Sequence, residues 1–418
     1  MYSKFHQTWQ TRKTTVCRAS DYERIITGSP TGFGHTDEER LDVSKLKVMT
    51  IVGTRPEIIR LSEVIKKLDV YFEHTLVHTG QNWDYTLNQI FFEELGLRSP
   101  DKYLEAVGET LGQTMGNILA KAYDVFREVS PDALLILGDT NSALSAIPAK
   151  RLKIPVFHME AGNRCFDENL PEEINRRIVD HISDVNLPYT EHARRYLLSE
   201  GIRKEHIFVT GSPMAEVLLA HRDSIQSSDV LARLALESGR YLLVSAHREE
   251  NIDQEHNFFA LMTALNRIAE DYGMPIVYSM HPRSRKAIEA RDFKLHPLVR
   301  SLPPFGFFDY NKLQLNAFCV LSDSGTVPEE SAILGFPAVS IRTSTERPEA
   351  IDKGGIILGG VEYEDVVQAV ELARSMWENH EAAVPVPDYC DTNVSVKVVK
   401  IIQSYTKIVN RVIWRKET

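Results

Sequence analysis

The hydrophobic residues of this 418-residue chain change their spacing at about residue 46. From there, short apolar runs alternate with longer segments in which apolar residues recur every three or four positions. The short runs predict buried strands and the longer segments predict helices, as expected of βα units around a parallel sheet. Within residues 171–183, for example, Ile174, Ile178 and Ile182 form one apolar stripe along a predicted helix.

The predicted strands fall into two groups, separated by the polar residues 226–238. The first group covers residues 48–52, 75–78, 133–137, 156–159, 185–187 and 207–210, and the second covers 241–245, 276–280, 320–321 and 338–341. Helices are predicted at residues 114–129, 171–183, 258–272 and 329–334. We therefore expect an α/β fold of two doubly wound, Rossmann-like domains that face each other across a cleft.

The same patterns predict the domain limits. Residues 1–45 are polar, lack the apolar segment of a signal peptide and are expected to form a poorly ordered extension, with a regulatory tail as the alternative. Residues 46–222 form the first predicted domain and residues 223–393 the second. Residues 394–418 are predicted to form a terminal helix that packs back onto the first domain.

Composition narrows the class of protein. A hydrophobic content of 43% and a charged content of 25% are ordinary for a soluble globular protein. The formal charge of −10 argues against a nucleic-acid surface. Four scattered cysteines form no metal-binding spacing, and no apolar stretch is long enough to cross a membrane, so a reducing cytoplasm is expected.

Polar motifs follow the predicted strands, where parallel sheets bind ligands. Gly53 and Pro56 frame a turn that opens a helix, with Arg55 and Arg60 close to its N-terminus. Such a helix start offers backbone N–H groups to an anion, and it matches neither a dinucleotide-binding nor a P-loop pattern. The alternative is an ordinary strand-to-helix turn with a surface arginine.

Three carboxylates follow consecutive strands. Asp139 and Glu160 each come directly after a predicted strand, and Glu172 opens the next predicted helix. Converging on one cleft, they would shift one another's pKa values, as acid–base catalysis requires. Structural alternatives are an N-cap for Asp139 and, for Glu172, the favourable helix dipole or an ion pair with Arg176 four residues on.

The second half of the chain repeats this logic. A lone histidine is more often structural, but His247 lies in a polar loop after the first strand of the second group, the same topological position as Gly53 in the first group, which favours a functional role. The segment Asp323-Ser324-Gly325-Thr326 precedes a predicted helix and suits a diphosphate, and Glu330 suits ribose hydroxyl groups. Arg347 adds positive charge ahead of another helix start. A pair of well-capped helices is the alternative for these segments.

Together the motifs are similar to those of one family. GTRPE, HMEAG, PEEINR, SAHREEN, DSGTVPEE and TERPEA occur in this order between about residues 46 and 360. In this they resemble the non-hydrolysing UDP-N-acetylglucosamine 2-epimerases. The resemblance implies a two-domain GT-B-like fold in which the second domain binds UDP, with no cofactor, no metal and a homodimeric assembly.

The resemblance also implies roles for individual residues. It assigns catalysis to Asp139, Glu160, Glu172 and His247. It assigns substrate binding to a second set, which we extend with Arg176 from the PEEINR segment: Arg55, Arg60, Arg176, Ser324, Gly325, Thr326, Glu330 and Arg347.

Some residues depart from the family pattern. Arg60 stands where the family has lysine, and Gly325-Thr326 where it has two glycines. Residues Asn82-Trp83-Asp84-Tyr85 differ from the segment that binds an activator in some members, which puts allosteric control by substrate in doubt. GTRPEIIRLS with HMEAGNRCFD looks most like the subgroup that makes UDP-N-acetyl-L-fucosamine from a 6-deoxy-L-talose precursor.

The implied chemistry is inversion at C2 of a UDP-N-acetylhexosamine, for cell-surface polysaccharide precursors. Anti elimination of UDP gives a 2-acetamidoglycal, which is protonated on the opposite face before UDP adds back. Such a site needs an acid, a base and a positively charged diphosphate cradle. Three alternatives stay open: a GT-B glycosyltransferase, a non-catalytic UDP-sugar sensor and a hydrolysing epimerase.

Overall fold

The computed structural model describes residues 44–80, 89–168, 170–342, 345, 347–381 and 386–416. Almost all of the predicted extension, residues 1–45, lies outside this description, as do residues 82–85, which depart from the activator-binding segment of some family members. Within it, residues Lys45–Thr418 belong to one compact unit that contains two parallel sheets.

The first sheet has six strands in the order β3-β2-β1-β4-β5-β6, all parallel to one another. Every residue of β4 is buried, because helices cover both faces of the sheet. The strands are β1 (Lys47–Val52), β2 (Glu73–His78), β3 (Lys102–Tyr103), β4 (Ala133–Leu137), β5 (Val156–Met159) and β6 (Val185–Leu187).

The second sheet has the same winding, with six parallel strands in the order β12-β11-β10-β7-β8-β9. In both sheets the order of the strands therefore reverses beside the first strand. This is the topology of a doubly wound sheet, and the predicted pair of Rossmann-like units is confirmed. The strands are β7 (Leu242–Ser245), β8 (Ile276–Ser279), β9 (Val299–Leu302), β10 (Cys319–Ser322), β11 (Ala338–Ser340) and β12 (Ile357–Leu358).

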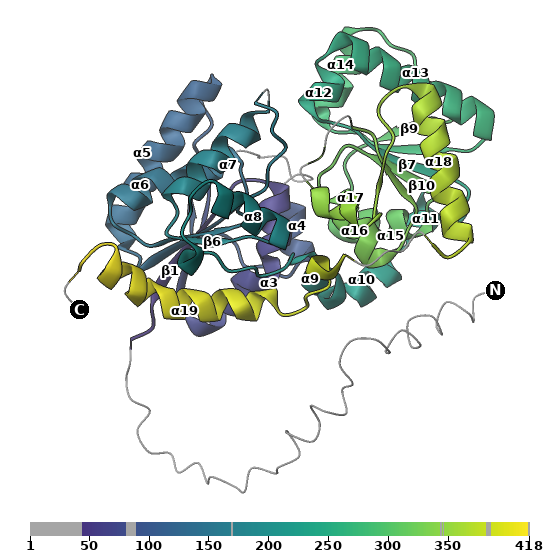
Figure 1. The fold of residues 1–418 in the computed structure, drawn as a ribbon. Helices are drawn as coiled ribbons and strands as arrows, with labels where there is room; N and C mark the ends of the chain where they lie inside the picture. Colours follow the sequence, from purple (N-terminus) through teal and green to yellow (C-terminus); the bar gives the residue numbers. More distant parts are fainter. Residues whose placement is uncertain are drawn as a thin grey trace, which may run out of the picture. The chain divides into compact units, whose positions relative to one another are not determined.

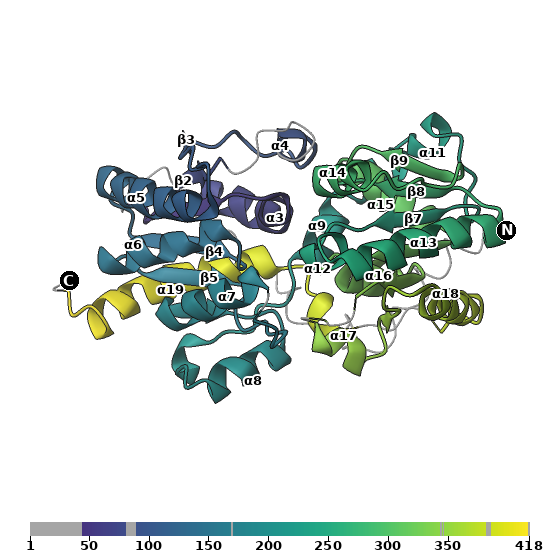
Figure 2. The ribbon, with the colours of Figure 1, turned by 90° about the horizontal axis from the view of Figure 1, so that it is seen from above.

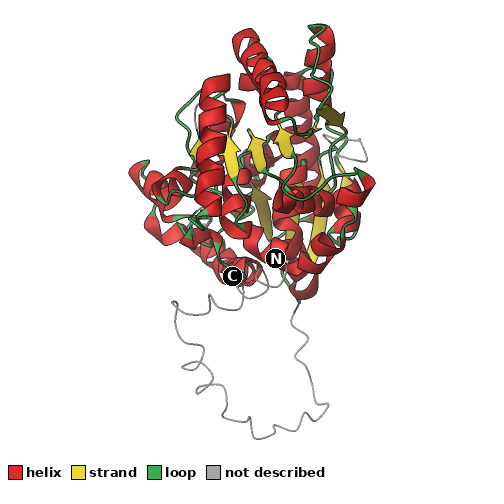
Figure 3. Cartoon of the chain, turned by 90° about the vertical axis from the view of Figure 1, so that its right-hand side faces the viewer, coloured by secondary structure: helices red, strands yellow, loops and turns green. Residues whose placement is uncertain are grey.

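Helices enclose the strands of both sheets, as Figure 3 shows in red and yellow. Those before the second sheet are α3 (Arg55–Tyr71), α4 (Gln89–Glu94), α5 (Leu111–Val129), η2 (Asn141–Ser145), α6 (Ala146–Arg151), α7 (Pro171–Ile182), α8 (Glu191–Ser199), η3 (Lys204–His206), α9 (Met214–Ala220), α10 (Arg222–Ser227) and α11 (Val230–Arg233). Those after it begins are α12 (Glu249–Ile252), α13 (Glu255–Tyr272), α14 (Pro282–Ala290), α15 (Phe307–Asn316), α16 (Val327–Leu334), α17 (Pro348–Asp352), α18 (Tyr363–Glu378), η4 (Pro387–Tyr389) and α19 (Val394–Val412). In Figure 2, α5, α6 and α7 lie beside the first sheet, and α13 and α18 beside the second.

The last helix, α19, returns to the first sheet. It packs against α3, and its buried residues Val398, Ile402 and Val409 join the core formed by β1, β4 and α3. Figure 1 shows this helix in yellow, running beneath α3. The chain therefore crosses twice between the two sheets, although the domain limits at residues 222 and 393 stay a prediction.

Two predictions about local structure are wrong. Residues 207–210 form only an isolated bridge between Ile207 and Asn186 and not a strand. On α7, Ile174 is 53% exposed and Ile178 is 39% exposed, so the apolar stripe does not face the core throughout. The buried side of α7 instead carries Glu173, Arg176 and Asp180 among others, because this helix directs charged groups toward the ends of β4 and β5.

Among the described residues, no helix is at once long enough and apolar enough to cross a membrane.

The packing of α19 can be tested with one substitution at two positions. Val398 is fully buried against α3, whereas Val412 of the same helix is 51% exposed. We expect Val398→Ala to lower the free energy of unfolding by about 2 kcal/mol, because two buried methyl groups are lost and a cavity remains. Val412→Ala is the matched control and should change it by less than about 0.5 kcal/mol. Equal effects in urea unfolding would contradict the packing described here.

Candidate active site

A cleft lies where the carboxyl ends of β7, β8 and β10 meet the start of α3. Residues from both halves of the chain line it: Arg55, Pro56, Ile59, Arg60, Phe91 and Met214 from the first half, and Ser245, Ser279, Phe305, Gly306, Phe307, Tyr310, Asn311, Ser324, Thr326 and Glu330 from the second. Five predicted binding residues therefore lie in one cleft.

The β1–α3 turn positions both arginines of the first half. The carboxylate of Glu57 accepts hydrogen bonds from the backbone N–H groups of Gly53 (2.6 Å) and Thr54 (2.7 Å), which holds the helix start in place. Its other oxygen accepts hydrogen bonds from the hydroxyl groups of Thr140 and Ser142, beside the end of β4. Glu57 thus acts structurally, and it fixes Arg55 at the first residue of α3 and Arg60 further along the helix.

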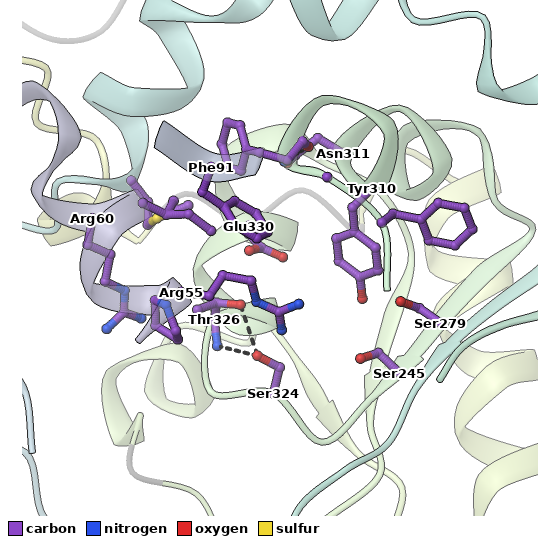
Figure 4. A pocket seen from close by; sticks show the side chains of 16 residues that line it. Arg55, Arg60, Phe91, Ser245, Ser279, Tyr310, Asn311, Ser324, Thr326 and Glu330 are labelled. Carbon is purple, nitrogen blue, oxygen red and sulfur yellow. Dashed lines mark hydrogen bonds between the residues drawn. The ribbon is translucent and has the colours of Figure 1, made fainter. Parts of the chain in front are cut away.

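Arg55 occupies the middle of the cleft, with Ser324 and Thr326 on one side and Tyr310 on the other (Figure 4). Burial lowers the pKa of Arg55, partly opposed by Tyr310 and Glu330. Burial also disfavours the charged form of Glu330 and so raises its pKa. The carboxylate of Glu330 accepts a 2.5 Å hydrogen bond from Gln314. Aromatic rings, hydroxyl groups and a carboxylate at this end suit a nucleoside.

The N-terminal end of α16 faces the same cleft. The hydroxyl groups of Ser324 and Thr326 lie 3.0 Å apart, and the backbone N–H of Ser324 is bound by the Ser322 hydroxyl. Ser324 and Thr326 line the cleft directly, beside Arg55 and Arg60. Hydroxyl groups at a helix start, with two arginines opposite, have the chemistry that a diphosphate site requires.

Glu160 lies beside this cleft and is bound to two arginines. One carboxylate oxygen pairs with Arg60 and the other with Arg347, and Asn163 donates a third hydrogen bond at 3.2 Å. Burial alone would raise the pKa of Glu160, but the charges of Arg60 and Arg347 outweigh it and hold the pKa at about 2. Glu160 is therefore ionised at neutral pH while both arginines stay in contact with it.

The backbone at Glu160 is unusual. Its φ of +64° lies in the left-handed region, which residues other than glycine seldom adopt. The strained residue follows β5 directly and precedes Gly162, which is also left-handed and is held by the Asp180 carboxylate. Strain of this kind persists only where surrounding contacts enforce it, and it occurs most often at functional sites.

Asp139 and Glu160 follow neighbouring strands. Leu137 of β4 and Met159 of β5 are register partners, so the two acidic residues come just beyond the same edge of the sheet. Asp139 accepts two hydrogen bonds from Arg176, at 3.0 and 2.6 Å, and remains 22% exposed. Parallel-sheet geometry therefore places these two residues at the same edge of the sheet, as the order of the motifs predicts.

Arg176 and Glu172 both lie on α7 and are not among the residues that line the cleft. Arg176, predicted to bind substrate, pairs with Asp139 and with Glu173 at 3.1 Å. The i,i+4 ion pair of this helix joins Glu173 to Arg177, at 3.1 Å. Glu172 lies half-buried in the first turn of α7 and is not among the residues that line the cleft.

His247 lies in the loop after β7, fastened by Asp323. The Asp323 carboxylate accepts hydrogen bonds from the backbone N–H groups of His247 and Arg248, both at 2.8 Å, and from Asn251 at 3.2 Å. Burial, followed by the positive charge of Arg55, lowers the pKa of His247 to about 3. The imidazole is therefore neutral at neutral pH and can accept or donate one hydrogen bond.

Most of the predicted residues therefore lie in or beside the cleft, although only five of them line it. Arg60 lines the cleft and pairs with Glu160, which also binds Arg347. The positive charge of Arg55 contributes to the lowered pKa of His247. Sequence reasoning missed Glu329, Tyr310 and Gln314. Glu329 stands inside the quoted DSGTVPEE segment, but its first-turn position gave no reason to prefer it to Glu330.

Comparison with known proteins decides the family. The family model for UDP-N-acetylglucosamine 2-epimerase matches residues 66–403. The chain belongs to the UDP-N-acetylglucosamine 2-epimerase family. The predicted family, the isomerase class and the GT-B-like arrangement of two Rossmann-like units are therefore confirmed.

Individual members of this epimerase family are similar over most of the chain. The structure of the Rickettsia bellii UDP-N-acetylglucosamine 2-epimerase is 47% identical, with a TM-score of 0.82 over 89% of this chain and 100% of that one. The Methanocaldococcus jannaschii epimerase in complex with UDP-GlcNAc and UDP is 34% identical, with a TM-score of 0.80 over 86% and 99%. A Pseudomonas aeruginosa relative, UDP-2,3-diacetamido-2,3-dideoxy-D-glucuronate 2-epimerase, is 35% identical over 78% of this chain and 92% of its own length.

The role of Asp323 in holding the His247 loop can be tested by Asp323→Ala. One carboxylate oxygen of Asp323 accepts all three hydrogen bonds of the loop, so alanine leaves these N–H groups without their acceptor. We expect the free energy of unfolding to fall by about 1–3 kcal/mol, and the Michaelis constant for UDP-sugar to rise as the loop loosens. Asp253→Ala, at an exposed position after α12, is the control and should change neither. An unchanged Michaelis constant in Asp323→Ala would refute this role.

Proposed function

We propose that the protein inverts C2 of a UDP-N-acetylhexosamine by eliminating UDP and adding it back. One observation supports this most strongly: two carboxylates, Asp139 and Glu160, follow adjacent strands beside a cleft lined by arginines and a helix start. The complex of the Methanocaldococcus jannaschii relative with UDP-GlcNAc and UDP agrees with a nucleotide in this cleft.

Each part of the site has a chemical task in this proposal. Cleaving the C1–O bond places negative charge on UDP, which Arg55, Arg60 and the start of α16 are placed to stabilise. The positive character that develops at C1 acidifies the proton on C2. One carboxylate then removes that proton, and another group returns one on the opposite face of the 2-acetamidoglycal.

We propose Asp139, Glu160 and Glu172 for the two proton transfers, with neutral His247 as a hydrogen-bonding group beside UDP. Arg176 is more plausibly a partner of Asp139 than a direct substrate ligand, because its guanidinium group binds that carboxylate twice. Ser324, Gly325, Thr326, Glu330 and Arg347 are the proposed contacts of the nucleotide.

The identity of the sugar is a finer proposal. We propose either the UDP-N-acetylglucosamine/mannosamine pair or the conversion of UDP-N-acetyl-6-deoxy-L-talosamine to UDP-N-acetyl-L-fucosamine, as a step toward cell-surface polysaccharide. The Pseudomonas aeruginosa relative acts, by its name, on a diacetamido-glucuronate, so members of similar identity differ in their sugars. NMR of the product with each UDP-sugar in turn separates these substrates.

Location and assembly complete the proposal. We propose a cytoplasmic protein, and the three cysteines of the described residues are all unpaired thiols. We also propose a homodimer, and the exposed Ile174 and Ile178 on α7 offer an apolar surface for a second copy.

Deuterated water tests the mechanism directly. We expect epimerised UDP-sugar to carry solvent deuterium at C2, because the proton is removed and replaced during turnover. Asp139→Asn and Glu160→Gln should still bind UDP and lower turnover by about 10²–10⁴-fold, the usual contribution of a general acid or base. Glu168→Gln is the matched control, since its side chain is 75% exposed in the same loop region.

The outcomes also distinguish the alternatives. Product without deuterium at C2 would rule out proton exchange as the mechanism. Free UDP formed in step with free sugar would indicate a hydrolysing epimerase, and turnover that requires an added acceptor would indicate a glycosyltransferase. Tight binding without any exchange would indicate a sensor.

A further inference from the structure

Four buried charged side chains form a closed ring beside the cleft. Arg60 of α3 pairs with Glu160 and, at 2.9 Å, with Glu329 of α16. Arg347, just before α17, pairs with the same two carboxylates, at 2.8 Å for Glu329. Each guanidinium therefore bridges both carboxylates, and the ring joins the first half of the chain to the second.

The two carboxylates are not held equally. The side chain of Glu329 is fully buried and accepts an additional hydrogen bond from the hydroxyl group of Ser212. The side chain of Glu160 is 10% exposed, and its additional partner Asn163 donates at 3.2 Å. An ion that enters from the cleft therefore has easier access to the guanidinium contacts of Glu160 than to those of Glu329.

Both arginines have hydrogen-bonding capacity left. Among the described residues, neither Nε of Arg60 nor Nη1 of Arg347 has a hydrogen-bond partner, although both atoms are buried. Buried donors of this kind are costly unless a partner is supplied. Arg60 also lines the cleft beside Ser324 and Thr326. An anion with several oxygens at the start of α16 would supply the missing acceptors.

We infer that Glu329 is a positioning residue that anchors Arg60 and Arg347, so that the diphosphate of a bound nucleotide sugar displaces Glu160, and not Glu329, from the two guanidinium groups. This inference rests on the proposed function, in which Glu160 transfers a proton. In the free protein both arginines bind the Glu160 carboxylate. When substrate binds, Glu160 loses these contacts and can transfer a proton.

The inference has a consequence for protons. The ionisable groups that face Glu160 are Arg60 of α3, Arg347 before α17 and Tyr189 after β6, with Glu329 of α16 behind the arginines. While both arginines are in contact, the pKa of Glu160 is about 2 and the group is ionised. When diphosphate takes their charge, burial dominates and the pKa rises. Nucleotide-sugar binding should therefore take up a proton at mildly acidic pH, with uptake fading as the pH rises past the new pKa.

Proton uptake can be measured with a pH indicator in weakly buffered solution while UDP-N-acetylglucosamine is added. Both of its phosphates are diesters and keep a constant charge, and epimerisation itself consumes no proton. We expect uptake approaching one proton per site in the wild-type chain. It should vanish in Glu160→Gln and persist in Glu168→Gln, a matched loss of an exposed carboxylate outside the ring.

The role of Glu329 needs its own variants. Glu329→Gln leaves Glu160 as the only carboxylate for two guanidinium groups, so uptake should fall while the nucleotide still binds, and Glu329→Asp should restore it. Should Glu329→Gln not fold, Arg347→Lys replaces it, because an ammonium group lacks the Nε–H with which Arg347 contacts the Gly325 carbonyl and is held less precisely between the two carboxylates. Uptake should again be smaller than in the wild-type chain.

Uptake in Glu160→Gln equal to that of the wild-type chain would overturn the inference, as would wild-type uptake in both Glu329→Gln and Arg347→Lys. Failure of the proposed function is a different result: the nucleotide sugar would not bind, or would bind without C2 exchange in deuterated water. A chain that exchanges deuterium at C2 and binds without proton uptake retains its function and refutes the anchoring of the arginines by Glu329.

Discussion

The burial of charge between Arg60, Glu160, Glu329 and Arg347 is the interaction on which the site depends. Removing charges from water is expensive, and a buried ion pair offsets that cost only when its geometry and its hydrogen bonds are nearly complete. The ring alternates two guanidinium groups with two carboxylates, and an anion bound beside it would complete the hydrogen bonds of Arg60 and Arg347. Because the partners come from α3, the end of β5, α16 and the start of α17, the ring links the two halves of the chain at the active site.

Strand order explains how distant segments reach this point. In each sheet the chain begins in the middle, at β1 or β7, and winds outward in both directions. Loops after the central strands therefore meet at one edge, where β1, β4 and β5 deliver Arg55, Asp139 and Glu160. The corresponding edge of the second sheet delivers His247 and Ser324. Helix α19 then packs its apolar face against α3, the helix that carries both Arg55 and Arg60.

Much of this arrangement follows from the sequence, because apolar runs and the motifs after them specify where parallel strands end. Asp139 and Glu160 lie at the same edge of the first sheet for that reason. The short strands β3 and β12 were not predictable, since two residues give no periodicity. The inward charged face of α7 was missed because hydrophobic spacing alone favoured Ile174 and Ile178 as core residues. The role of Glu329 was missed because bridging by two arginines is a property of tertiary structure, which spacing along the chain does not encode.

The central claim is that a sugar bound to UDP meets the carboxylates at the ends of β4 and β5. A crystal structure of the Asp139→Asn protein with UDP-N-acetylglucosamine tests it most directly. The account predicts the diphosphate between the start of α16 and Arg60, with C2 of the sugar within reach of Glu160. A sugar ring directed away from Glu160, with both arginines still bound to that carboxylate, would contradict it.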